Sequence, residues 1–116
     1  MPHIVVENGP NKGQNVHVAE DSPLVVGRDP KCAIVLKDPL LSRKHFAVRF
    51  IKKMLVLEDL KSVNGTYLNG ERLKTRSRLG DGDRIQAGET LLTYFANQAL
   101  DPLIGKTISG TGMDIP

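Results

Sequence analysis

The sequence predicts an all-β fold, a β-sandwich of two antiparallel sheets with about ten or eleven short strands. Apolar residues alternate with polar ones at period two, as on the half-buried face of a strand. Turn residues are frequent, with 11 Gly and 7 Pro among 116 residues, and they divide the chain into short apolar runs. No segment has the apolar spacing of a helix of useful length, so a sandwich is favoured over a mixed fold.

Ten segments are predicted as strands. In 46–51 the apolar side chains recur at every second position, whereas 54–59 is more continuously apolar, as in a strand covered on both sides. Lys52-Lys53 between them predicts an antiparallel hairpin. The other predicted strands, in chain order, are 4–7, 15–18, 24–27, 34–36, 66–68, 71–73, 84–86 and 89–96.

Turn chemistry separates these strands. Asn69-Gly70 lies between two short apolar segments and is a strong hairpin signal, because a type I′ turn needs positive φ at both central positions. Further Gly-, Pro-, Asn- or Asp-bearing turns are expected at 8–11, 29–30, 80–83 and 87–88. The period-two pattern is lost from about residue 100 onward, and we expect one domain over 1–97 and a tail or linker over 98–116.

Composition restricts the class of protein and of partner. A chain of this length can form its own core without disulfides or metals, and the single Cys32 fits a reducing, cytoplasmic location. No apolar run approaches the roughly 20 residues of a membrane-spanning helix. The net charge of +3 suits an anionic partner, but no basic run has interleaved aromatic rings, so neither nucleic acid nor membrane is expected as a partner.

One basic stretch alternates with neutral residues. This pattern is typical of one solvated face of a strand or loop rather than of a groove for a polyanion. Its four cations are Arg72, Lys74, Arg76 and Arg78.

Three short polar segments carry most of the chemistry. Gly27-Arg28, Ser42-Arg43-Lys44-His45 and the run from Ser62 to Gly70 each lie between apolar runs, so each is predicted in a loop that joins strands. Together they offer two guanidiniums, a hydroxyl and amide side chains. This set suits a phosphorylated side chain, which has three acceptor oxygens and a charge of about −1.5 to −2, because arginine presents a planar fork that is always protonated.

In this order, and on short strands, the motifs resemble those of the forkhead-associated (FHA) domain, a phosphothreonine-peptide recognition module. The motifs are Gly27-Arg28, Ser42-x-x-His45 and Asn64-Gly65-Thr66-x-x-Asn69-Gly70, and the resemblance runs from about residue 4 to 96. It implies a non-catalytic module of signal transduction, with its recognition loops at one end of the sandwich. The implied partner is a phosphothreonine-bearing protein, a substrate of a Ser/Thr kinase.

The resemblance also implies a role for each motif residue. Arg28 and Ser42 contact the phosphate, Arg43 adds a second cation there, and the backbone N–H of Val63 is a further donor. Asn64 bonds the main chain of the bound peptide. The remaining motif residues shape the loops: Gly27, where a sharp turn is expected, with His45, Gly65, Thr66 and Asn69.

Three further expectations concern Val63, the segment before Ser42, and His45. Many members of the family carry a hydroxyl residue where this chain has Val63, so a side-chain contact worth about 0.5–1.5 kcal/mol is in doubt. In the family the loop before Ser42 reads the residue three positions after the phosphothreonine. Leu40 or Leu41 is therefore expected to favour an apolar residue there. His45 is expected to be buried as a brace of its loop rather than to act as a base for Ser42.

Two alternatives remain open. The chain fits a phosphate-independent interaction domain that uses a sheet face, or a regulatory domain of a larger signalling protein. An enzyme is not expected, since the three histidines are scattered without cysteine companions and Asp81-Gly82-Asp83 has the pattern of a turn. Neither cofactor nor metal is expected. A phosphorylated threonine in the tail, such as Thr107 or Thr111, is a candidate self-ligand.

Overall fold

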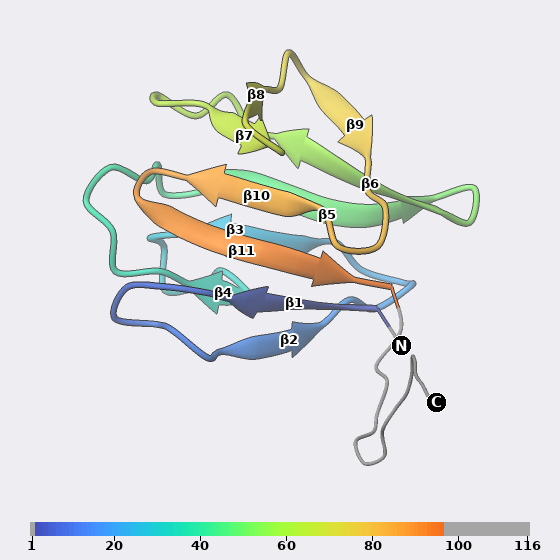
Figure 1. Ribbon diagram of the computed structural model, residues 1–116, viewed down its shortest axis with the longest axis horizontal. Coiled ribbons are helices and arrows are strands. Elements are labelled where there is room, and N and C mark those ends of the chain that lie inside the picture. The colour runs from blue at the N-terminus through green and yellow to red at the C-terminus, as the bar shows by residue number, and fades with distance from the viewer. Residues whose placement is uncertain (1, 97–116) are drawn as a thin grey trace, which may run out of the picture.

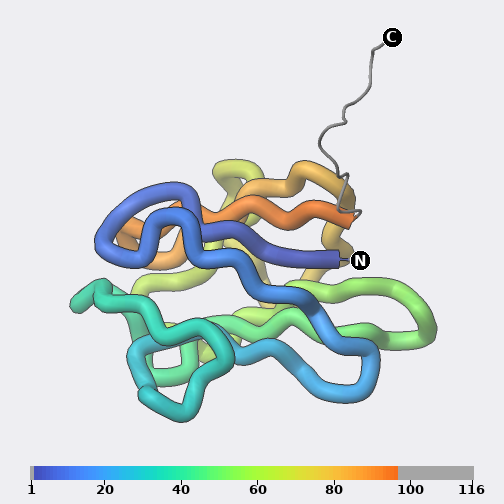
Figure 2. Tube along the Cα trace, turned by 90° about the horizontal axis from the view of Figure 1, so that it is seen from below, coloured from blue at the N-terminus to red at the C-terminus, as the bar shows by residue number. Residues whose placement is uncertain are grey.

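The computed structural model describes residues 2–96, which form two β-sheets packed face to face (Figures 1 and 2). The predicted tail over 98–116, with its threonines, lies outside the described residues. The six-stranded sheet has the order β2 (Asn15–His17), β1 (His3–Val6), β11 (Thr90–Phe95), β10 (Arg84–Ala87), β7 (Thr66–Leu68), β8 (Glu71–Arg72). The five-stranded sheet has the order β4 (Ile34–Val35), β3 (Leu24–Gly27), β5 (Phe46–Ile51), β6 (Met54–Asp59), β9 (Arg76–Arg78).

The all-β prediction is confirmed, and each of the ten predicted strands is present with bounds that differ by at most one residue. The eleventh strand, β9, lies in the basic stretch, and its sequence, Arg-Ser-Arg, has no apolar residue to mark it. One pair departs from the antiparallel expectation. β3 and β4 are parallel, with Val26 opposite Ile34, because the chain between them makes a short excursion and returns in the same direction.

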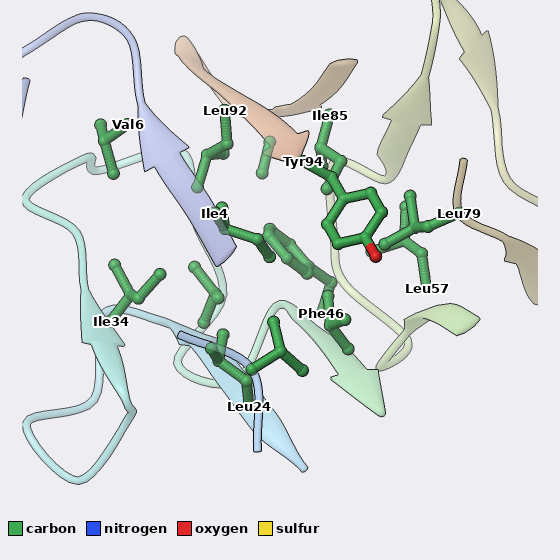
Figure 3. Packing of buried hydrophobic residues seen from close by; sticks show 14 of the residues in the cluster. Ile4, Val6, Leu24, Ile34, Phe46, Leu57, Leu79, Ile85, Leu92 and Tyr94 are labelled. Atoms are coloured by element: carbon green, nitrogen blue, oxygen red, sulfur yellow. The ribbon is translucent and has the colours of Figure 1, made fainter. Parts of the chain in front are cut away.

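The core fills the space between the sheets. Phe46 and Ile4 are fully buried at its centre, in contact range of side chains from both layers (Figure 3). Leu55, Val56 and Leu57 are consecutive and all buried, which confirms the expectation that this strand is covered on both sides. A continuous core under both sheets holds the strand ends, and therefore the loops, in place.

Both predicted hairpins have the backbone that a two-residue turn requires. Lys52 and Lys53 have φ of 50° and 66°, and Asn69 and Gly70 have φ of 50° and 87°. Positive φ at both central positions matches the right-handed twist of the flanking strands. No helix in residues 2–96 is long and apolar enough to cross a membrane.

The polar segments meet at one end of the sandwich. Because β3, β5 and β6 are successively antiparallel, the end of β3, the start of β5 and the end of β6 lie side by side. The backbone around His45 joins them, since its N–H donates to Val26 O at 2.9 Å and its carbonyl accepts from Leu60 N at 3.0 Å. The loops after β3, before β5 and after β6 therefore share this end.

Candidate functional site

Gly27 is required by a close approach of two backbones. The Arg28 N–H donates to Ser42 O at 3.3 Å and the Asp29 N–H donates to Arg43 O at 3.1 Å. A Cβ on Gly27 would lie 2.0 Å from the Arg43 carbonyl oxygen, so no larger residue fits. Gly27 does not have the positive φ of a left-handed turn. The small size of Gly27, rather than a left-handed backbone, is therefore what the close approach of the two segments requires.

Arg28 and Arg43 are exposed on the same hollow of the surface. Together with Asp29 and Pro30 they line a pocket of about 310 Å³. The Arg28 Nε donates to Leu41 O at 2.5 Å, which holds the guanidinium plane in place. Within residues 2–96 the terminal nitrogens of Arg28 have no hydrogen-bond partner, so the outer edge of its fork is open to an anion.

The Ser42 hydroxyl joins two of the loops. Its Oγ accepts the Val63 N–H at 3.0 Å, so the predicted backbone donor is engaged by Ser42 in this state. An oxygen that accepts at one side can still donate its own proton at another. The Val63 side chain is 82% exposed at the rim, where it offers no donor.

His45 braces the same two loops from below. It is fully buried, which confirms that expectation. Its Nδ1 accepts the Ser42 backbone N–H at 3.1 Å, and its Nε2 lies 2.8 Å from Gly65 O. Since a backbone N–H only donates and a carbonyl only accepts, the neutral ring with its proton on Nε2 satisfies both bonds. Both ring nitrogens are thereby used by the backbone, and neither serves as a base for the Ser42 hydroxyl.

Asp59, which the sequence did not single out, organises the loop after β6. Its Oδ1 accepts from Ser62 Oγ at 2.5 Å and from Thr66 Oγ1 at 2.7 Å, and Ser62 Oγ accepts the Gly65 N–H at 3.0 Å. Burial alone raises the pKa of the Asp59 carboxyl, but the hydrogen bonds from Ser62 and Thr66 outweigh it and lower the pKa. An Asp three residues before a Ser at a strand end is a turn signal that could have identified it.

Asn64 and Leu40 connect the third loop to the segment before Ser42. The Asn64 Nδ2 donates to Leu40 O at 2.7 Å, while the Asn64 side chain stays exposed. Leu40 is 44% exposed, whereas Leu41 is 2% exposed and belongs to the core. Of the two leucines predicted to read the ligand, only Leu40 faces solvent, because the turn that begins at Asp38 places the Leu41 side chain in the core.

Asp38, also missed, fastens this segment to the turn between β10 and β11. Its carboxylate is buried and accepts from Leu40 N at 2.9 Å, Glu89 N at 2.8 Å and Thr90 Oγ1 at 2.9 Å. A Cβ on Gly88 would lie 2.6 Å from its Oδ2. Burial alone raises the pKa of Asp38, but these three bonds outweigh it and lower the pKa.

The remaining predicted loop residues have distinct structural places. Gly65 has a φ of 86°, and the Arg72 Nε lies 2.6 Å from where a Cβ on Gly65 would be. Thr66 is fully buried. Asn69 lies in the β7–β8 hairpin, where its side chain bonds Asp83 and the Arg84 backbone rather than the other loops.

The arrangement suits recognition of an anion together with its backbone. Two guanidiniums line one pocket, and the backbone of Arg28 is bonded to that of Ser42, whose hydroxyl lies on the neighbouring loop. The exposed amide of Asn64 is bonded to Leu40, two residues before Ser42. Within residues 2–96 no group of three or more His, Cys, Asp or Glu could hold a metal ion.

Comparison with known proteins gives concordant matches. Residues 24–88 match the family model of the FHA domain. The oxoglutarate dehydrogenase inhibitor of Corynebacterium efficiens is 34% identical over 96 residues, which is 83% of this chain and 66% of that protein. The glycogen accumulation regulator GarA of Mycobacterium tuberculosis is 31% identical over 109 residues, 94% of this chain and 64% of that protein. This chain thus spans slightly less than two thirds of the length of these relatives.

A solved structure gives the same result at the level of the fold. The MEK1 FHA domain in complex with a phosphothreonine peptide of HOP1 superposes with a TM-score of 0.70 and 30% identity. The match covers 84% of this chain and 97% of that one.

Proposed function

The chain belongs to the FHA domain family, and from this premise we propose that it binds phosphothreonine-bearing proteins through the loops at one end of its sandwich. The module carries no catalysis of its own, and its partner is a substrate of a Ser/Thr kinase. The observation that carries the proposal is the pocket lined by both Arg28 and Arg43, on two loops that the bond from Arg28 N–H to Ser42 O joins.

The phosphate is held by charge-assisted hydrogen bonds. The bond from Arg28 Nε to Leu41 O presents the other edge of the guanidinium to the phosphate oxygens. Because Ser42 Oγ already accepts from Val63 N–H, its own proton is directed to the ligand. Val63 N–H therefore acts through Ser42 rather than as a direct donor, and Arg43 adds charge at the rim. Two or three such bonds, at about 1.5–3 kcal/mol each, support a micromolar affinity of about −8 kcal/mol.

The peptide backbone is held by Asn64. Its Nδ2 bonds Leu40 O, which leaves Oδ1 available to accept an N–H of an extended ligand. Leu40 is the exposed apolar side chain next to this position and supports an apolar preference three residues after the phosphothreonine. A peptide array with a strong acidic preference at that position would contradict this assignment.

Arg28→Ala tests the phosphate site, with Arg84→Ala as the matched control. Arg84 is exposed on β10 of the other sheet, so its removal changes the net charge equally. We expect Arg28→Ala to weaken binding of a phosphothreonine peptide at least about 100-fold in calorimetry, since two charge-assisted bonds are lost, while Arg84→Ala binds as the unchanged chain does. Undiminished binding by a folded Arg28→Ala variant would refute the site.

The wider setting is part of the same proposal. The relatives are named as an inhibitor and a regulator, which supports a regulatory domain of a larger signalling protein. The module comprises residues 1–97, and 98–116 serve as a tail or linker. The free thiol of Cys32 supports a cytoplasmic location, which fractionation of cells that produce the protein would test.

A further inference from the structure

Four exposed cations follow one another along the edge of the sandwich without an acidic partner. Within residues 2–96 the ion pair of the structure joins Arg49 to Glu58, and none of the four takes part in it. They occupy every second position of one segment: Arg72, Lys74, Arg76 and Arg78. The phosphate site uses none of them.

Two of these cations lie on a strand with an open edge. β9 is the last strand of its sheet and pairs only with β6 (Figure 1). On the β6 side, the Asp59 N–H donates to Thr75 O and the Leu79 N–H donates to Leu55 O, both at 2.9 Å. Hydrogen bonding alternates along an antiparallel pair, so Ser77 also faces β6. The N–H and C=O groups of Arg76 and Arg78 therefore point away from β6, toward the open edge.

The side chains on this edge are exposed to solvent, as its unpaired backbone groups are. Arg76 and Arg78 are exposed and stand on the outer face of the sheet, opposite Glu58 and Val56 of β6. The Glu58 carboxylate is taken by Arg49. The Arg78 carbonyl accepts a local bond from Ser77 Oγ at 3.3 Å, which leaves its second lone pair available.

The edge begins next to the recognition loops. Thr75, the residue just before β9, accepts the N–H of Asp59, the residue that organises the loop after β6. Arg72, at the start of the basic segment, lies against Gly65 of the same loop. An extended chain that leaves the phosphate site on this side would meet the four exposed cations of this segment.

We propose that the open edge of β9 is a strand-addition site for an acidic, extended segment of a protein partner. Such a segment pairs with the outward N–H and C=O groups of Arg76 and Arg78, as in other complexes in which a peptide extends a sheet. Its acidic side chains, at every second position, then lie beside the two guanidiniums, because cross-strand pairs on one face are neighbours. The site does not depend on phosphothreonine, so it can be tested independently of the phosphate pocket.

Amide hydrogen exchange on the ¹⁵N-labelled full chain tests the site directly. The probe is an unphosphorylated peptide of alternating glutamate and threonine, and the control peptide has lysine in place of glutamate. We expect the acidic peptide to slow exchange of the Arg76 and Arg78 amides, which face the open edge, and to leave the Ser77 amide, already bonded within the sheet, unchanged. Unchanged exchange at Arg76 and Arg78 with saturating peptide would overturn the proposal. The cations would then serve only to keep this edge from pairing.

Paired substitutions at one position separate the backbone from the charge. Arg78→Ala and Arg78→Pro both remove the guanidinium, but only proline removes the outward N–H, and no bond to β6 is lost with it. We expect Arg78→Pro to bind the acidic peptide roughly two- to tenfold more weakly than Arg78→Ala, the value of one net hydrogen bond. Equal affinity of the two folded variants would exclude strand addition.

Charge reversal gives the second readout. Arg76→Glu and Arg78→Glu should each weaken binding of the acidic peptide and reduce the dependence of that binding on salt. Arg84→Glu, on the other sheet, should change neither. Arg28→Ala should bind the unphosphorylated acidic peptide as the unchanged chain does. Loss of acidic-peptide binding in Arg28→Ala would mean that the peptide occupies the phosphate pocket instead, and would overturn the proposal.

Discussion

At the scale of single residues, His45 illustrates how the loops are held. Its two ring nitrogens bond Ser42 N and Gly65 O inside a fully buried environment. We expect His45→Ala to lower the free energy of unfolding by about 2–4 kcal/mol, because a cavity forms and two buried backbone groups lose their partners. Urea denaturation measures this. His17→Ala, at an exposed position of β2, is the control and should change stability by less than about 0.5 kcal/mol.

A His45→Ala variant with unchanged stability would contradict this structural role. A variant that loses stability yet retains full binding would show that the loops keep their shape without the ring.

Gly27 provides a second test at this scale. We expect Gly27→Ala to destabilise the fold by about 1–3 kcal/mol, since its Cβ meets the Arg43 carbonyl at 2.0 Å and the two segments must separate. Gly80→Ala is the matched control, because its Cβ has only Asp83 Oδ2 nearby, at 3.7 Å, and its φ is not in the left-handed region. Thermal unfolding compares the two, and equal effects would contradict the argument from close approach.

At the scale of elements, two carboxylates hold loops to the strands around them. Asp59 holds the loop after β6, and Asp38 holds the segment before Ser42 against the β10–β11 turn. Both have a lowered pKa in the folded chain. Such a group stabilises the fold above its unfolded pKa, about 3.9, and this stabilisation is lost as pH falls through the lower folded pKa.

This linkage predicts a specific pH dependence. Asp59→Asn should be less stable than the unchanged chain at pH 7, and the difference should shrink as the pH falls below about 4. Asp21→Asn, at an exposed position between β2 and β3, is the control. Thermal unfolding as a function of pH measures the effect. A difference that stays constant from neutral to strongly acidic pH would show that the carboxylate charge of Asp59 does not contribute.

Most elements could be predicted from the sequence because each has a local signal. Alternation marked the strands, and Asn69-Gly70 marked a hairpin whose two positive φ values are observed. β9 was missed because its sequence, Arg-Ser-Arg, contains no apolar residue. An edge strand needs only one covered face, and here the polar Ser77 is the residue that is partly buried. Asp59 and Asp38 were missed because their partners, Thr66 and Thr90 among them, become neighbours only in the folded chain.

The site itself was predicted less completely than the fold. Arg28 and Arg43 lie at one pocket, and hydrogen bonds join Ser42 to Val63 and His45, whereas Asn69 lies in a separate hairpin. The choice between Leu40 and Leu41 could not be made from sequence, since both are apolar and only the bend at Asp38 decides which one is buried. The engagement of Val63 N–H by Ser42 likewise depends on how two distant loops meet.

At the scale of the whole molecule, the apolar core and the polar recognition loops occupy different parts of the sandwich. The core lies between the sheets, and the pocket proposed for the phosphate lies on loops that backbone bonds and buried side chains hold at one end. The relatives are longer than this chain, which fits a recognition module that works together with further segments. The open edge of β9 would let the same molecule engage a partner at two points at once.

The central claim is that binding depends on the phosphate. Calorimetric titration tests this claim most directly. One peptide is selected from a degenerate phosphothreonine library and is titrated into the chain in two forms, with phosphothreonine and with unmodified threonine. The proposed site predicts micromolar affinity for the phosphorylated form and no measurable binding of the unmodified form. Equal affinity for the two forms would contradict it and would point to a phosphate-independent interaction through another surface.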